Sequence, residues 1–460
     1  MTWPDLTAID ASQAFWTIAV GALSNTSCAV LGCYLVLRRM SLLGDAISHA
    51  ILPGIVLAFL LTGQTASWPM LLGAVGIGVL TAVVTQTLHV SGNVPEDASM
   101  GVVFTSLFAL GVVLIALAPS NVDLDIDCVL MGRPEDVFVK ESWLLNLVAD
   151  ITQRPAEELL LRAPLLEVPS KVPSLVAVLA ATAAFVALFW KELKIASFDP
   201  ALATAMGISA ALVHYLLMGM VAAVTVAAFD AVGSVLVIAM LIVPAATAHL
   251  LTDRLGWMVG WSVVVAIVSA VLGYLGDVCF DTGVAGMMAV GAGLQFLLAV
   301  FLAPRHGLVS KLWHRLALAM RIVSEDLVAV LYRFEETTGE TQTAGVPWDL
   351  CRRIAGGGLT AWLAAPRLWW RGEVRPVAGG RLRLTPRWRQ SAQSLVRSHR
   401  LWEAFLGEHF QLPLDHLHES AERVEHFIGP KLQERLATDL HQPGRDPHGK
   451  EIPVVKDVER

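Results

Sequence analysis

The chain divides into two parts by the pattern of its apolar residues. Residues 1–304 carry one long apolar run after another, and from Pro304 onward charged residues and tryptophans become frequent. A membrane-spanning helix needs about 20 apolar residues. By that measure we expect about nine transmembrane helices, at 14–37, 42–62, 69–89, 100–118, 173–190, 208–228, 231–251, 257–276 and 284–303. The pattern therefore predicts an all-α polytopic membrane domain followed by a soluble domain.

Composition and charge agree with this division. The chain is 55% hydrophobic and 16% charged, with a mean hydropathy of +0.61. The Lys and Arg residues that follow the first, fifth, seventh and ninth spans all fall on one side, which the positive-inside rule identifies as the cytoplasm. We therefore expect a plasma (inner) membrane protein with its N-terminus outside and its C-terminal domain in the cytoplasm. The net charge of −7 gives no indication of nucleic-acid binding.

The five cysteines give no metal or redox motif, because none of them forms a Cys-x-x-Cys pair. Cys128 and Cys279 both fall in predicted external loops, where a disulfide is chemically allowed. Two lone thiols are the alternative interpretation.

The second predicted span contains two ionisable residues, Asp45 and His49. They are four residues apart, so they share one face of a helix. An Asp at the centre of a membrane helix costs about 2.5–3.5 kcal/mol, and such residues usually face a cavity or an ion pathway. A carboxylate and an imidazole together are ligands for a divalent transition metal. Solvation at the membrane edge, or helix capping, is the alternative.

The run Ser41-Leu-Leu-Gly-Asp-Ala-Ile-Ser-His-Ala-Ile-Leu-Pro-Gly54 resembles the signature of the permease subunits of manganese, zinc and iron ABC importers. Residues 94–112, 198–207 and 230–251 resemble further segments of that family. The resemblance implies a metal pathway at Asp45 and His49 and an ATPase-docking segment at 198–207. The residues of that segment that we single out are Phe198, Asp199, Pro200, Ala205 and Gly207. An ordinary loop helix without a partner is the alternative.

Transport through such a permease needs an ATPase, which we expect to be a separate chain. The string closest to a phosphate-binding loop is 444–451, but it has Glu451 where the magnesium-binding Ser or Thr belongs, and Pro453 interrupts any following helix. The chain is therefore expected not to be an enzyme and to hold no permanent cofactor. The resemblance also implies an extracytoplasmic metal-binding protein and a second permease chain as partners.

The soluble part has its own pattern. Ser324–Glu336 has helical periodicity, Val346–Arg353 follows as a second helix, and Glu373–Leu384 contains two short strand-like runs around a Gly-Gly turn. Together these elements predict a winged helix. Further on, Glu422 and Glu425–His426 have i, i+3 and i+4 spacing, which predicts a divalent-metal site on one helical face. A solvated charged face paired with arginines is the alternative.

This second part resembles the iron- and manganese-dependent regulators related to the diphtheria toxin repressor. The resemblance rests on 384–387, 395–403, 418–426 and 446–453. It implies a primary metal site made by Asp326, Glu422, Glu425 and His426, and a second site made by His399, Glu403 and His418. Glu422 stands where the iron branch has cysteine, and the harder carboxylate suits Mn²⁺ better than Zn²⁺ or Fe²⁺. Ala329 stands where the manganese branch expects an acid.

DNA binding is the weaker expectation for this domain. The segment in the place of a recognition helix, 359–367, has one Arg and one Trp in mostly apolar sequence. We expect four parts: a permease domain (1–304), a linker (305–323), a winged-helix-like domain (324–390) and a helical metal-binding and dimerisation domain (391–460). The predicted function is a permease for divalent metal ions, Mn²⁺ favoured, with a cytoplasmic metal sensor. The alternative is a membrane-tethered, metal-dependent transcription regulator.

Overall fold

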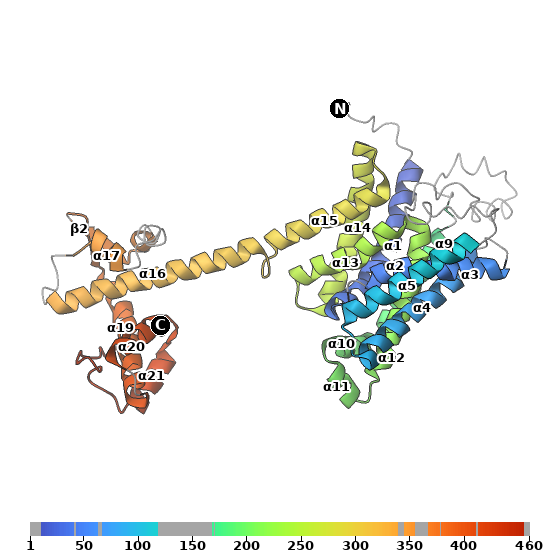
Figure 1. Ribbon diagram of the computed structural model, residues 1–460. Helices are drawn as coiled ribbons and strands as arrows, with labels where there is room; N and C mark the ends of the chain where they lie inside the picture. Colours follow the sequence, from blue (N-terminus) through green and yellow to red (C-terminus); the bar gives the residue numbers. More distant parts are fainter. Residues whose placement is uncertain are drawn as a thin grey trace. The chain divides into compact units, whose positions relative to one another are not determined.

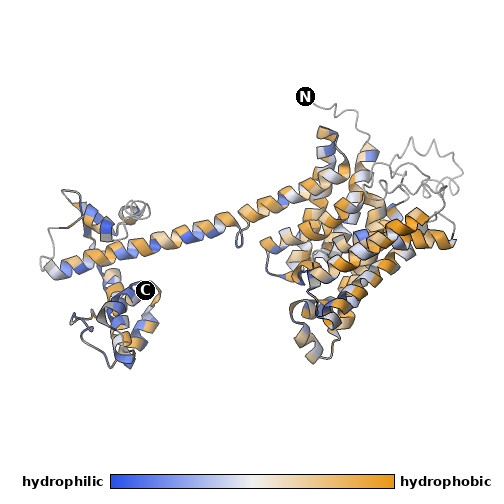
Figure 2. Ribbon diagram, in the orientation of Figure 1, coloured by the Kyte–Doolittle hydropathy of each residue, from blue (hydrophilic) through white to orange (hydrophobic). Residues whose placement is uncertain are grey.

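The computed structural model divides the chain into two compact units, Met1–Ser310 and Lys311–Arg460. It describes residues 11–40, 43–62, 67–117, 168–169, 171–338, 345–354, 367–377, 379–410 and 413–454. Figure 2 shows that the helices of the first unit are hydrophobic along most of their length, whereas hydrophobic and hydrophilic residues are mixed along those of the second. The first unit is thus suited to lipid, and the second to water.

The described part of the first unit consists of helices packed in a bundle (Figure 1). Seven described helices are long and apolar enough to cross a membrane, and the bent pair α9–α10 is an eighth candidate. The elements are α1 (Ala11–Leu37), α2 (Leu43–Ala50), α3 (Leu52–Thr62), α4 (Ser67–Gly92), α5 (Glu96–Leu117), α9 (Val172–Leu188), α10 (Trp190–Phe198), α11 (Pro200–Ala205), α12 (Ala210–Val232), α13 (Ser234–Leu251), α14 (Leu255–Phe280) and α15 (Val284–Leu302).

The count of nine spans is approximate, and two predicted spans differ from the structure. The stretch 42–62 is two helices, α2 and α3, that meet at Ile51. Pro53 has no N–H, so a continuous helix here could not make the hydrogen bond to the carbonyl of His49. The stretch 173–190 corresponds to α9, and the chain then bends by 72° into α10. The apolar run alone gave no sign of either break.

Helix α1 is the packing centre of the membrane bundle and lies against α9, α12, α13 and α14. At Gly32 a Cβ atom would lie 1.8 Å from the carbonyl oxygen of Leu241 on α13. At Gly21 and Gly273 it would lie within 2.4 Å of Met288 on α15. Small residues that let helix backbones approach are typical of packing in membranes, where apolar burial supplies little driving force. The bundle therefore depends on close fit.

The second unit begins with a winged helix made by α16 (Leu308–Thr338), β1 (Val346–Pro347), α17 (Trp348–Ile354), β2 (Val374–Val377) and β3 (Arg381–Leu384). Its antiparallel sheet has the order β1-β3-β2, with Val374 paired to Leu384. Gly379 and Gly380 have φ of +83° and +67° in the turn between β2 and β3, where glycine has no steric cost. The predicted hairpin is confirmed. In the predicted recognition segment 359–367, residues 359–366 lie outside the described residues.

Four further elements complete the second unit: α19 (Pro386–His409), α20 (Leu414–Val424), the 3₁₀ turn η4 (Glu425–Phe427) and α21 (Pro430–Asp439). Leu401 of α19 packs with Ile428, Leu436 and Ile452 in a small core. Arg400, next to Leu401, is 2% exposed and makes two hydrogen bonds to the carboxylate of Glu336, at 2.5 and 2.9 Å. The guanidinium also donates to the backbone carbonyl of Glu451. Arg400 therefore joins α16, α19 and the chain beyond α21.

Candidate metal sites

Asp45 and His49 both lie on the short helix α2, one turn apart. The ring of His49 is half-buried and lies against Phe104 and Phe108 of α5, with ring centroids 6.2 and 6.0 Å apart. The side chain of Asp45 is outside the described part of the structure. The aromatic neighbours hold the imidazole beside the break between α2 and α3. Their apolar rings also lower the local polarity, which strengthens any electrostatic interaction of the imidazole there.

The predicted ATPase-docking segment forms the turn from α10 into α11. Asp199 ends α10 and caps α11, because its Oδ1 accepts a hydrogen bond of 2.9 Å from the amide of Leu202. Pro200 occupies the first position of α11, where a proline is favoured. Gly207 has a φ of +82°, and Ala205 is the last residue of α11. Phe198 is 59% exposed, so the turn presents an apolar side chain on its surface.

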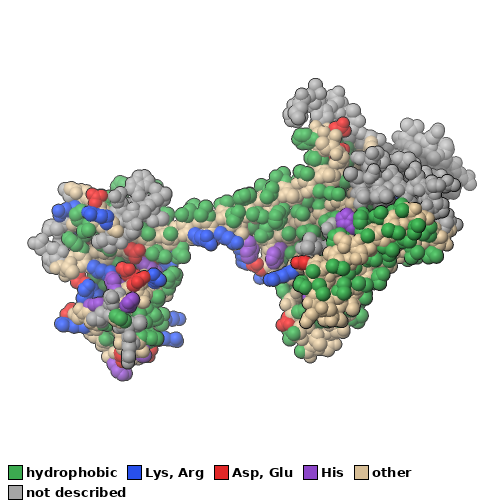
Figure 3. All heavy atoms as spheres, viewed as in Figure 1, with side chains coloured by type: hydrophobic (Ala, Val, Ile, Leu, Met, Phe, Trp, Pro, Cys, Tyr) green, Lys and Arg blue, Asp and Glu red, His purple; other side chains and the backbone are tan. Residues whose placement is uncertain are grey.

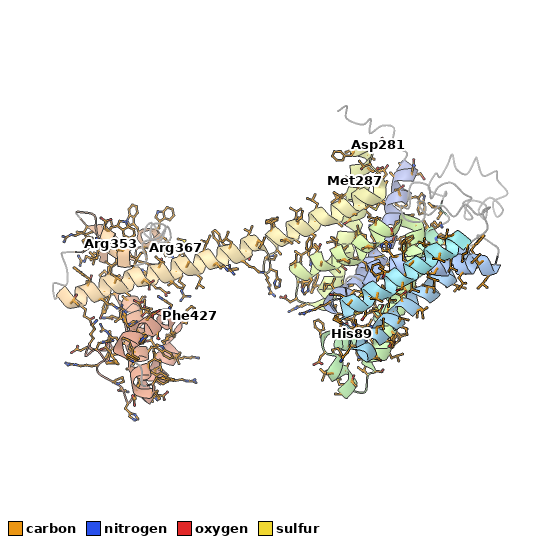
Figure 4. The ribbon with its side chains drawn as sticks, in the orientation of Figure 1. His89, Asp281, Met287, Arg353, Arg367 and Phe427 are labelled. Carbon is orange, nitrogen blue, oxygen red and sulfur yellow. The ribbon has the colours of Figure 1, made fainter. Side chains whose placement is uncertain are left out.

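Arg38 at the end of α1 binds two helices of this region. Its Nε donates to the hydroxyl of Ser197 on α10 at 3.1 Å, and its Nη1 lies 3.2 Å from Nδ1 of His214 on α12. The α10–α11 turn lies at one end of the bundle (Figure 1), and Asp281, in the α14–α15 turn, lies at the other (Figure 4). Because Arg38 at the end of α1 contacts both α10 and α12, a displacement of α10 would be transmitted directly to α1 and α12.

The first C-terminal cluster joins His399 and Glu403 of α19 to His418 of α20. The Nε2 atom of His399 lies 3.0 Å from Oε1 of Glu403 and 2.9 Å from Nδ1 of His418. The same Glu403 oxygen lies 2.9 Å from Nδ1 of His418. His399 and Glu403 are buried, and His418 is half exposed. Three donor atoms from two helices thus converge on one point that solvent reaches from one side.

The second C-terminal cluster joins Asp326 of α16 to Glu425 and His426 of η4. The Nε2 atom of His426 lies 3.2 Å from Oδ1 of Asp326. The other ring nitrogen lies 2.8 Å from a carboxylate oxygen of Glu325. Glu425 is 3% exposed and is hydrogen-bonded to Nδ1 of His399, which connects the two clusters.

One residue of the predicted metal sites lies elsewhere in the structure, and two residues near the clusters were not predicted from the sequence. Glu422 of α20 is not part of the cluster of Asp326, Glu425 and His426; it is 57% exposed and its Oε1 lies 3.6 Å from Nε2 of His418. Glu325 was missed because its partner His426 is 101 residues away, and no local spacing predicts that contact. His448 was missed although it lies in the repressor-like run 446–453; its Nε2 is 3.8 Å from Oε1 of Glu403.

The charges of both clusters are strongly coupled. Burial would lower the pKa of His426, but hydrogen bonds to Asp326 and Glu325 outweigh burial and raise it to about 9. Burial likewise opposes the net upward shift in the pKa of His399, which the hydrogen bonds with Glu403 and Glu425 produce. Burial would raise the pKa of Glu403, but its contacts with His399 and then His418 lower it to about 2. The neighbouring carboxylates thus favour the protonated forms of His399 and His426, and a metal ion that binds there would displace those protons.

The geometry of the donor sets fits a divalent transition metal. Two ligands bound at about 2.1 Å and roughly 90° to each other lie about 3 Å apart. The donor atoms of the first cluster are 2.9–3.0 Å apart, and those of His426 and Asp326 are 3.2 Å apart. In each cluster the atoms all lie within 4.8 Å of one another. His399, Glu403 and His418 would hold one ion, and Asp326, Glu425 and His426 a second.

Comparison with known proteins identifies the family of the membrane unit. Residues 11–152 and 165–303 match the model of the ABC 3 transport family. The chain belongs to the ABC 3 transport family. Residues 385–454 match a second model, the metal binding and dimerisation domain of iron dependent repressors. The chain is therefore a multi-pass membrane protein of the ABC 3 family with a repressor-like domain at its C-terminal end, as the sequence predicted.

Relatives of this ABC 3 protein match about two thirds of its length. It is 44% identical over 296 residues to the manganese transport system membrane protein MntD of Bacillus subtilis, covering 64% of this chain and 94% of that protein. It is 38% identical over 317 residues to the zinc transport system membrane protein TroD of Treponema pallidum, covering 68% and 79%. The solved structure of PsaBC from Streptococcus pneumoniae in complex with Fab is similar, with a TM-score of 0.50, 31% identity and coverage of 64% and 92%.

Proposed function

We propose that the chain is the permease subunit of an ATP-driven importer of divalent transition metal ions, with Mn²⁺ as the favoured substrate. The observation that carries this proposal is the 44% identity to a manganese transport system membrane protein over nearly all of that protein's length. The relative named as a zinc transport protein keeps Zn²⁺ among the candidate substrates. ATP hydrolysis is assigned to a separate ATPase subunit, and delivery of the ion to an extracytoplasmic metal-binding protein.

The proposed pathway includes Asp45 and His49. Two ligands on one short helix bind an ion more weakly than a complete coordination shell, which suits a site that must release its cargo. The break at Ile51 separates α2 from α3, so a movement of α2 would carry both ligands together.

The proposed coupling element is the turn from α10 to α11, with Phe198, Asp199, Pro200, Ala205 and Gly207. Its exposed apolar side chain and its rigid cap would let an ATPase surface bind and push it as one body. Arg38, through Ser197 and His214, would pass that movement to α1 and α12. A second permease chain would supply the other half of the transporter.

The proposed role of the C-terminal domain is feedback by intracellular metal. Its two clusters present ligands from α16, α19, α20 and η4, so an ion bound there would fix these elements relative to one another. Glu425, which touches both clusters, would make the occupancy of one depend on the other. The domain would sit on the cytoplasmic side, where it samples the imported ion.

The test is uptake of radioactive manganese by vesicles that carry the chain together with its ATPase. Asp45→Ala and His49→Ala should abolish ATP-dependent uptake. Matched controls are Asp97→Ala, on the exposed first turn of α5, and His249→Ala, on the exposed last turn of α13, and both should retain it. Failure of the wild-type chain to take up any of Mn²⁺, Zn²⁺ and Fe²⁺ would reject the transporter assignment.

Feedback is tested in the same vesicles with Mn²⁺ supplied on the side of the C-terminal domain. Uptake by the wild-type chain should slow as that Mn²⁺ concentration rises, whereas uptake by the Glu425→Gln variant should continue at its initial rate. Equal slowing of both chains would reject the regulatory role and leave the transport assignment standing.

A further inference from the structure

The N-terminal half of α16 has an apolar face that the described parts of the chain leave exposed. Leu308, Leu312 and Leu316 follow one another at four-residue intervals and are 52%, 59% and 46% exposed. Val309 and Trp313 lie beside them and are 54% and 71% exposed. Residues three and four apart share a helix face, so these five side chains form one continuous stripe, which we call the α16 stripe.

The opposite face of the same segment is basic. His314 and Arg321 lie on it, Lys311 and Arg315 lie at its border with the stripe, and residues 305–324 contain four Lys and Arg and no Asp or Glu. Figure 3 shows hydrophobic side chains along one edge of the N-terminal part of α16 and Lys and Arg side chains along the other. Farther along, Arg321 is bound to Glu325 at 2.8 Å, and the buried residues Leu327 and Leu331 belong to the core of the winged helix. The exposed stripe therefore ends where the folded domain begins.

We propose that the α16 stripe docks on the anionic lipid surface of the membrane at the side where α15 ends. A helix with one apolar face that includes a Trp, and a polar face rich in Lys and Arg, is the pattern of helices that lie in the lipid–water interface. The stripe starts at Leu308, six residues after the last residue of the membrane helix α15, Leu302. The chain therefore enters this segment while still at the membrane surface.

Charge favours lipid over a second copy of the same face. Lys311 and Arg315 flank the stripe, so pairing two identical stripes would bring cations close to cations. Anionic phospholipid headgroups would instead neutralise them, since juxtamembrane Lys and Arg are attracted to the negative surface of the cytoplasmic leaflet. The interaction goes beyond the transport function and does not depend on it; it would hold the winged helix close to the bilayer.

The test is spin-label accessibility in the full chain, with its five cysteines replaced, in vesicles of phosphatidylcholine with and without phosphatidylglycerol. Labels at Leu312 and Leu316 report on the stripe, and labels at Ser310 and His314 on the opposite face. Leu297 of α15 serves as the lipid reference and Lys431 of α21 as the aqueous reference. With phosphatidylglycerol present, the stripe labels should collide with oxygen as Leu297 does and exclude a water-soluble nickel complex, while the polar-face labels should collide with the nickel complex.

A charge-reversed variant separates electrostatic docking from other causes. Lys311→Glu with Arg315→Glu should return the stripe labels to the aqueous pattern, whereas the control Lys431→Glu with Arg435→Glu, on exposed positions of α21, should leave them unchanged. Stripe labels that match Lys431 in anionic vesicles would overturn the proposal. Stripe labels hidden from both reagents would also overturn it, because they would report a protein contact, such as a second copy of the chain.

Discussion

In the membrane unit, buried polar side chains such as Thr81, Thr182 and Ser269 donate to a carbonyl of their own helix one turn earlier, at 2.7–2.8 Å. In the C-terminal unit, buried polar side chains such as Arg400 and His399 bind carboxylates on other elements. A hydroxyl that donates to a carbonyl of its own helix does not specify which helices pack against each other. A buried ion pair between two elements does specify their packing, because the loss of one partner leaves the other charge buried and unpaired.

The difference indicates which interactions stabilise each unit. The membrane unit is held by the fit of small residues, as at Gly32 against Leu241, so a change of shape should damage it most. The C-terminal unit is held by paired charges, and its proposed metal ligands belong to the same network. A change of charge should therefore damage its fold and its metal binding together.

Arg400→Ala should destabilise the C-terminal unit by about 3–5 kcal/mol, because it leaves the carboxylate of Glu336 and the buried Asp446 without their cation. The measurement is the hydrogen exchange of α16 and α19 amides in the full chain. The matched control is Arg423→Ala, which breaks an exposed pair with Glu419 and should cost less than about 1 kcal/mol. Equal exchange rates in the two variants would contradict the dependence of this unit on buried charge.

Glu425→Gln should weaken Mn²⁺ binding to the C-terminal clusters by ~100-fold, because it removes the negative charge of a ligand in one cluster and of the group that is hydrogen-bonded to His399 in the other. Calorimetric titration of the full chain with Mn²⁺ measures the loss. Glu434→Gln, on the exposed face of α21, is the control and should bind as the wild type does. Asp45→Ala should likewise leave this affinity unchanged, since Asp45 lies in the other unit.

Gly32→Ala should destabilise the membrane unit by about 1–3 kcal/mol, because its Cβ would lie 1.8 Å from the carbonyl oxygen of Leu241 and would push α1 away from α13. Thermal unfolding in detergent measures the change. Gly260→Ala on α14 adds the same methyl group where nothing lies within 4 Å, and it should be neutral or stabilising by up to about 1 kcal/mol. A similar loss of stability in Gly32→Ala and Gly260→Ala would show that the destabilisation does not come from a steric clash at Gly32.

The features that the sequence predicted are those encoded within a few residues of each other. His399, Glu403 and His418 came from the resemblance to the repressors, whereas the Gly-Gly turn at 379–380 and the helical periodicity of Ser324–Glu336 depend on local spacing. Each of these two local features combines a backbone or side-chain preference with a fixed periodicity, so one segment is enough to recognise it.

The features that it did not predict join distant segments or interrupt a uniform pattern. The contact of Glu325 with His426 and the tie of Arg400 to Glu336 depend on how α16 packs against α19 and η4. The break at Ile51 lies inside an uninterrupted apolar run, where hydropathy is the same on both sides. Hydropathy also could not show that α16 begins at Leu308 rather than at the predicted start, Ser324.

The binding of metal by the second cluster should also depend on pH. The pKa of His426 is raised from 6.5 to about 9, so near neutral pH its imidazole carries a proton that a metal ion must displace. The affinity for Mn²⁺ should therefore rise with pH, by up to about tenfold per unit for one released proton, and level off near pH 9. Titration calorimetry in buffers of different ionisation enthalpy measures both the affinity and the number of protons released.

Without metal, the stability of the folded state should change in the opposite direction. A folded-state pKa above the unfolded value stabilises the protein fully below about pH 6.5, and that contribution is lost as the pH rises through about 9. His426→Gln should remove both dependences, whereas His409→Gln, on the exposed last turn of α19, should keep them. If His426→Gln still released a proton on binding Mn²⁺ and kept the same slope, the proton would belong to the other cluster, and the contrast between a charge-dependent and a shape-dependent unit would then rest on His399 and Glu403.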